Sequence, residues 1–109
     1  MHKLDQDILA WIAEDTDSLQ LKAQIDSASV TKRDYMRTGY FIYFAVAADV
    51  LPVDKSLKLV SPDILSQELM DGAGTTLFLR DGKIHYLEIY ARGGFFPEGL
   101  KSYRLATPD

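Results

Sequence analysis

The sequence predicts an α+β fold in which two N-terminal helices and one short helix pack mainly on one face of an antiparallel sheet of about five or six strands. Three observations predict this class. Apolar residues recur at helical spacing near the N-terminus, β-branched and aromatic residues dominate from Val30 onward, and Asp81-Gly82 joins two strand-like runs. Because 109 residues are a usual domain size, we expect residues 1–109 to form a single α+β domain.

The first predicted helix starts at Leu4-Asp5, where the Asp5 side chain can cap the free backbone N–H groups. Its apolar side chains share one face, at Ile8, Leu9, Trp11 and Ile12. A polar run over residues 14–18 ends this pattern. A second helix is expected after it, at the helically spaced residues Leu21, Ile25 and Ala28.

Two extended runs, at about residues 29–37 and 40–48, predict a hairpin around Gly39. The second run is apolar on both faces, with Phe41 and Tyr43 on one and Ile42 and Phe44 on the other. This pattern is typical of a strand that is covered on both sides.

Residues 57–60 alternate in a way that predicts a short strand. A short helix is expected at about residues 62–70, because Ser61 can act as its N-cap and Pro62 suits the first helical position. Gly72 supplies a stop signal.

The Asp81-Gly82 pair predicts a two-residue type I′ turn, since both central positions of that turn need positive φ. In the resulting register Phe78 opposes His85, and both faces of the hairpin are apolar. Something must therefore cover the second sheet face. The possibilities are curvature that closes over a pocket, a homodimer, or a foreign protein partner, and Tyr43 and Tyr86 are the residues expected at a binding face.

The segment from Arg92 to Gly99 holds the adjacent aromatic residues Phe95 and Phe96 among glycines and a proline. Adjacent rings in a loop do not easily share one buried direction, so we expect one ring to plug the edge of the core and the other to be displayed. Arg92, Phe95 and Phe96 are therefore further candidate binding residues.

The net charge of −4 arises from the first 28 residues, which hold two basic and six acidic residues. An acidic chain without a basic run is a poor nucleic-acid binder. The absence of cysteine excludes a thiolate nucleophile or a disulfide framework, and the first residues contain no apolar signal segment. We therefore expect a cytoplasmic protein that binds no nucleic acid, membrane, cofactor or metal.

Catalytic patterns are sparse. His85 and Glu88 are expected on opposite faces of one strand, which excludes a metal dyad there. Asp49 and Glu88 are the acids in the most apolar surroundings, where burial would raise a pKa. An alternative function is thus a small cystatin-like ligand-binding or enzymatic domain with a pocket near Asp49, His85 or Glu88.

One basic spot surrounds Tyr35, formed by Lys32, Arg33 and Arg37. It is either a ligand contact or a solvated strand edge that resists aggregation.

The run from Leu77 to Ile84 with its Asp-Gly turn, followed by Leu87-Glu88-Ile89-Tyr90, resembles a C-terminal hairpin of small uncharacterised bacterial α+β proteins. Some of those are similar to immunity proteins of toxin systems. The resemblance implies a binding protein without catalysis. The leading expectation is accordingly a non-catalytic protein-interaction or immunity-like domain that uses an aromatic-rich sheet face.

Overall fold

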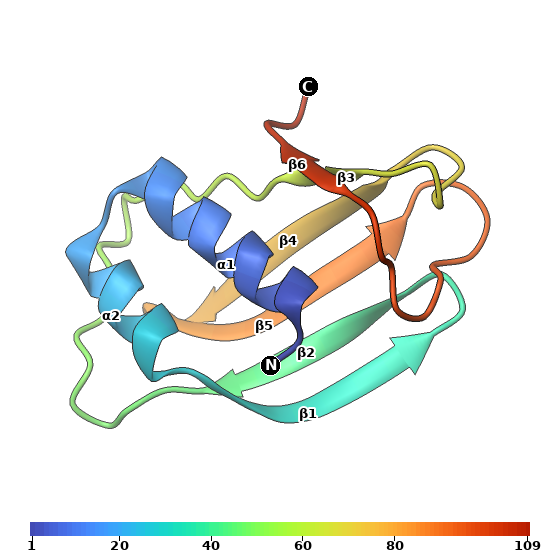
Figure 1. The fold of residues 1–109 in the computed structure, drawn as a ribbon. Helices are drawn as coiled ribbons and strands as arrows, with labels where there is room; N and C mark the ends of the chain where they lie inside the picture. The colour runs from blue at the N-terminus through green and yellow to red at the C-terminus, as the bar shows by residue number, and fades with distance from the viewer.

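The computed structural model describes all 109 residues and shows one six-stranded antiparallel sheet with two helices on one of its faces (Figure 1). The elements are α1 Lys3–Thr16, α2 Leu19–Ser27, β1 Ser29–Met36, β2 Gly39–Ala45, β3 Asp63–Leu65, β4 Ala73–Arg80, β5 Lys83–Ala91 and β6 Arg104–Ala106. The strand order is β1-β2-β5-β4-β3-β6. The predicted α+β class and antiparallel sheet are confirmed. Neither helix has the length and apolar character that crossing a membrane requires.

The hydrophobic core lies between the two helices and the sheet. Its fully buried side chains include Ile8, Leu9 and Ile12 of α1, Leu21 of α2, Ile42 of β2, and Leu87 and Ile89 of β5. Burying a side chain of this size contributes roughly 1.5–3 kcal/mol, so the helix layer is held mainly by these contacts. Both predicted N-terminal helices are present, and the apolar spacing of the first is confirmed. The spacing predicted for the second is wrong at Ala28, which is the extended C-cap of α2, and Gln24 is buried beside Leu21 in this helix.

The start of α1 differs from the prediction. His2 occupies the N-cap, and Asp5 is the third residue of the helix. The Asp5 side chain accepts a hydrogen bond from the His2 backbone N–H (3.1 Å) but is also fully buried under the sheet edge. Contacts of Asp5 with the distant residues Arg33 and Tyr40 therefore hold its side chain in this buried position.

The predicted hairpin of β1 and β2 is confirmed, with Met36 opposite Gly39. Gly39 is needed because a Cβ at this position would lie 1.9 Å from the carbonyl oxygen of Ile89 on β5. The side chains of β2 alternate as expected, with Ile42 and Phe44 buried under the helices.

The short helix expected at residues 62–70 is wrong, because strand β3 begins there instead. Ile64 is fully buried and pairs with Ala73 of β4 and Leu105 of β6. Pro62 is buried as well, and its carbonyl oxygen accepts a hydrogen bond from Thr75 Oγ1 (2.7 Å). Pairing across the sheet outweighs the local helix-start signal. The strand expected at residues 57–60 is also absent.

The type I′ turn is confirmed, with φ of 53° at Asp81 and 76° at Gly82. The expected opposition of Phe78 and His85 is wrong, because a β-bulge makes Phe78 pair with Tyr86. Because of the bulge, the aliphatic and the aromatic side chains of the hairpin lie on opposite faces of the sheet. Leucines and isoleucines of the hairpin face the core, whereas its aromatic side chains face away from the helices.

Candidate functional site

The sheet face opposite the helices carries a cluster of five rings, which we call the aromatic face. Its members come from β2, β4 and β5 and are Phe41, Tyr43, Phe78, His85 and Tyr86. Both helices lie on the other side of the sheet (Figure 1), and each ring of the cluster stays partly exposed. The structure thus brings the predicted binding residues Tyr43 and Tyr86 together.

Tyr86 lies at the centre of this cluster. Its ring stacks on Phe78 with centroids 4.5 Å apart and lies 5.4 Å from the ring of Tyr43. The ring centroids of Phe41 and His85 lie 5.9 and 5.2 Å from that of Tyr86. Aromatic pairs at such distances contribute about 0.5–1.5 kcal/mol each beyond buried area, so the rings hold one another in place.

Charges of both signs border the aromatic face. Lys32 of β1 lies 3.3 Å from a carboxylate oxygen of Asp34 and 5.7 Å from the centre of the Tyr43 ring. Asp34 and Glu88 both sit beside Phe41, as its partners on β1 and β5.

Because His85 contacts Tyr43 on the same face, the expectation that His85 and Glu88 face opposite ways is wrong.

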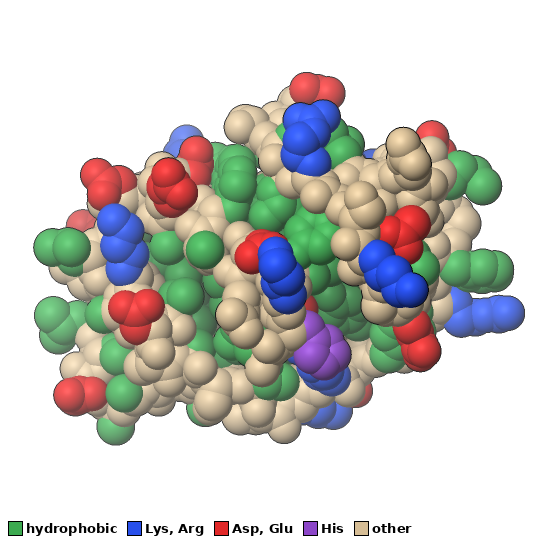
Figure 2. Space-filling model, in the orientation of Figure 1, with side chains coloured by type: hydrophobic (Ala, Val, Ile, Leu, Met, Phe, Trp, Pro, Cys, Tyr) green, Lys and Arg blue, Asp and Glu red, His purple; other side chains and the backbone are tan.

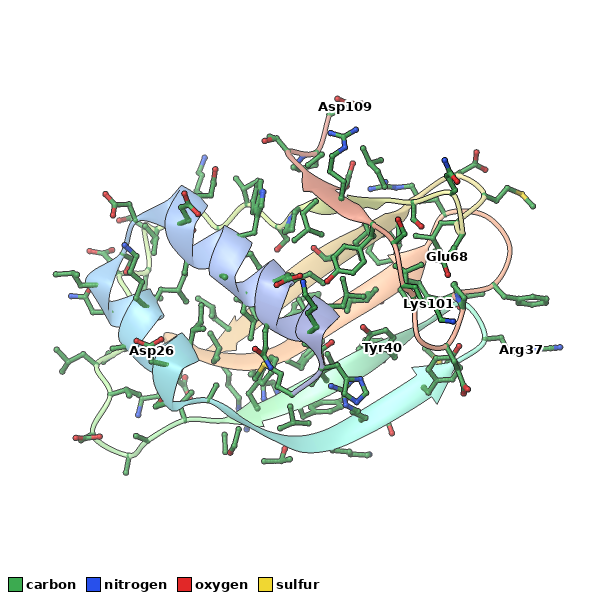
Figure 3. All side chains as sticks on the ribbon, in the orientation of Figure 1. Asp26, Arg37, Tyr40, Glu68, Lys101 and Asp109 are labelled. Carbon is green, nitrogen blue, oxygen red and sulfur yellow. The ribbon has the colours of Figure 1, made fainter.

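A pocket of about 520 Å³ lies on the helix side, between the start of α1, strands β1 and β2, and residues 96–103. Its lining is mixed, with His2, Lys3, Leu4, Arg33, Tyr35, Tyr40, Phe96, Pro97, Glu98, Gly99, Leu100, Lys101 and Tyr103. Figure 2 shows hydrophobic side chains in the hollow between α1 and the last loop, with Lys or Arg side chains on either side. Figure 3 places Tyr40 and Lys101 at this end of the molecule.

Asp5 anchors one wall of the pocket from behind. It forms an ion pair with Arg33 of β1 and accepts a hydrogen bond from Tyr40 Oη (3.1 Å). Burial, and secondarily the negative charge of Asp5, raise the pKa of the Tyr40 phenol. This network fixes the Arg33 guanidinium at the pocket wall.

A second polar group ties α1 to the last loop. Lys3 Nζ lies 2.7 Å from Asp7 Oδ2, and Tyr103 Oη donates to the same oxygen at 2.5 Å. The hydrogen bond with Lys3 lowers the pKa of Asp7 and raises that of Lys3. Burial and the hydrogen bond to Asp7 raise the pKa of Tyr103. These contacts hold the two sides of the pocket together.

The predicted division between Phe95 and Phe96 is confirmed. Phe96 is 3% exposed and packs edge-on against Tyr40 at 5.5 Å, whereas Phe95 is 65% exposed. The Arg37 guanidinium lies 4.9 Å from the Phe95 ring centre, and Tyr35 Oη donates to the Phe96 carbonyl oxygen at 2.5 Å. Phe96 therefore forms the pocket floor while Phe95 is displayed.

The other predicted residues lie apart from this pocket. Arg92 pairs with Asp63 of β3 at 2.6 Å, and that hydrogen bond raises the pKa of Arg92. Asp49 is exposed in a turn, so its expected apolar surroundings are wrong. Neither this pocket nor a second one, between α1 and α2, is lined by Asp49, His85 or Glu88.

Arg33 and Tyr35 of the basic spot line the pocket, but most of the other lining residues were not predicted from the sequence. Lys3, Lys101 and Tyr103 carry no local motif and meet only after folding.

No group of three or more His, Cys, Asp or Glu side chains is placed to hold a metal ion. No protein-family model, curated protein or solved structure matches the chain.

Proposed function

We propose that the protein is a non-catalytic protein-binding domain that docks through the aromatic face. One observation carries this proposal: both helices cover a single face of the sheet, while the other face bears five mutually packed rings centred on Tyr86. Aromatic clusters of this kind are enriched at the energetic centres of protein interfaces. Because the rings already hold one another, little side-chain freedom is lost on binding.

The occupant that best fits this face is a second copy of the same chain. A two-fold symmetric interface brings one surface against itself, so the surface must complement itself in charge. Lys32 supplies a positive charge beside the negative charges of Asp34 and Glu88, whereas a face of one sign would repel its copy. Binding without catalysis also agrees with the resemblance of the Asp81-Gly82 hairpin to immunity proteins.

Light scattering and sedimentation over a range of micromolar concentrations test this proposal. We expect the wild-type chain to dimerise. Tyr86→Lys should weaken the dimer by at least about 2 kcal/mol, or roughly thirtyfold in Kd, because it places a charge at the centre of the interface. Leu19→Lys is the matched control, since Leu19 is 80% exposed and belongs to the helix layer.

Thermal melts of both variants establish that they fold. A wild-type chain that stays monomeric at every concentration would rule out the second copy as the occupant. A dimer that survives Tyr86→Lys and is broken by Leu19→Lys would place the interface on the helix layer and refute the use of the aromatic face.

A further inference from the structure

We propose that the pocket at the start of α1 binds a small carboxylic acid with an apolar body, such as an aryl or short alkyl acid. This site lies on the helix side of the sheet and involves no residue of the aromatic face. The inference therefore stands independently of the proposed function.

The size and floor of the pocket fit such a molecule. Its volume of about 520 Å³ falls within the roughly 300–1,000 Å³ that is usual for small-molecule sites. Leu4, Tyr40 and Phe96 form an apolar floor and are each at most 8% exposed. Tyr40 and Phe96 meet edge to face at 5.5 Å, which leaves a shaped apolar surface for a ring or an alkyl chain.

The charges that line the pocket favour an anion. Lys3, Arg33 and Lys101 contribute three positive charges, and Glu98 contributes the one negative charge. Asp7 and Asp5 pair with Lys3 and Arg33 and balance their charges, but these two acids lie outside the lining, so the basic groups rather than the acids line the cavity. The N-terminal end of α1 also opens here, and its dipole adds positive potential.

Arg33 is the residue best placed to hold the carboxylate. One of its terminal nitrogens pairs with the fully buried Asp5, which fixes the side chain. A guanidinium has five N–H donors, so others remain for a ligand. Because Arg binds carboxylates through paired N–H groups, a guanidinium held in place from behind suits this ligand.

The outer wall of the pocket is formed before any ligand arrives. Glu68 accepts hydrogen bonds from the backbone N–H groups of Lys101 (3.1 Å) and Ser102 (2.8 Å). Figure 3 shows Glu68 close to Lys101 in this wall. Tyr103 ties the same segment to Asp7 on α1. A preformed wall lowers the ordering cost of binding.

The test is an NMR titration of the ¹⁵N-labelled chain with phenylacetate and, in parallel, with its neutral analogue phenylacetamide. We expect saturable shifts of the amides around the pocket with phenylacetate. Phenylacetamide should bind about tenfold more weakly, because it lacks the charge that pairs with Arg33. Absence of saturable binding, or equal binding of the two probes, would overturn the proposal.

Two variants locate the site. Lys101→Gln removes an exposed charge without touching the core and should weaken phenylacetate but not phenylacetamide, whereas Lys55→Gln, outside the pocket, should change neither. The paired change Asp5→Asn with Arg33→Gln leaves no buried charge unpaired and should abolish the preference for the acid. Unchanged phenylacetate binding in Lys101→Gln and in a folded paired variant would refute the assignment.

Discussion

Gln24 offers the sharpest test of how the helix layer is joined to the sheet. This side chain of α2 is fully buried and makes three hydrogen bonds to the backbone. Its Nε2 donates to the carbonyl oxygens of Leu51 (2.8 Å) and Gly82 (2.9 Å), and its Oε1 accepts from the N–H of Ile84 (2.9 Å). Gln24→Met keeps the length of the side chain and removes all three.

The expected loss follows from these contacts. Each hydrogen bond is worth about 1 kcal/mol net, and its loss costs more where the remaining partner is buried. The three bonds together give a loss of about 3 kcal/mol in the free energy of unfolding. For a domain of this size that corresponds to a fall of roughly 12 °C in Tm.

Urea unfolding followed by circular dichroism measures this loss, with Gln20→Met as the control. Gln20 is exposed on the same helix, so its substitution should change stability by less than about 0.5 kcal/mol. A loss below about 1 kcal/mol for Gln24→Met would show that Gln24 does not join α2 to the hairpin turn.

Three further predictions concern single positions. Gly82→Val should cost roughly 1–3 kcal/mol, because φ is 76° and a Cβ would lie 2.6 Å from Pro52; an unchanged urea midpoint would contradict the turn. Phe96→Ala should cost roughly 3–5 kcal/mol in thermal melts and Phe95→Ala less than about 0.5, and equal losses would contradict their different burial. The raised pKa of Tyr40 means that its contribution to stability is complete below the unfolded value near 10 and is lost as the pH rises through the folded value. Tyr40→Phe should therefore flatten the alkaline fall in the urea midpoint, and an unaltered slope would count against the assignment.

The features that the sequence predicts well depend on neighbouring residues. The Asp81-Gly82 turn follows from the φ angles that its two residues tolerate. The alternation of Ile42 and Phe44 with their polar or aromatic neighbours follows from the pleat of a strand. The division of Phe95 from Phe96 follows from their adjacency in a loop.

The features that it misses depend on distant residues. Strand β3 exists because Ile64 pairs on both sides, with partners that lie in β4 and β6. In the sequence Gln24 looks like an ordinary polar residue of a helix, although its hydrogen-bond partners lie 27 to 60 positions away. Beside the pocket, the hydrogen bond from Tyr103 to Asp7 likewise spans 96 positions. No local sequence pattern predicts these contacts between distant residues, since they form only when the helices pack on the sheet.

Concentration-dependent NMR spectra show directly whether the aromatic face binds a second copy of the chain. The most direct measurement is a series of ¹⁵N–¹H NMR spectra recorded while the protein concentration is raised through the micromolar range. We expect the amide shifts of Phe41, Tyr43, Phe78 and Tyr86 to depend on concentration, while those on the outer side of α1 and α2 stay constant. Spectra that do not change, or changes confined to the helix layer, would contradict this expectation.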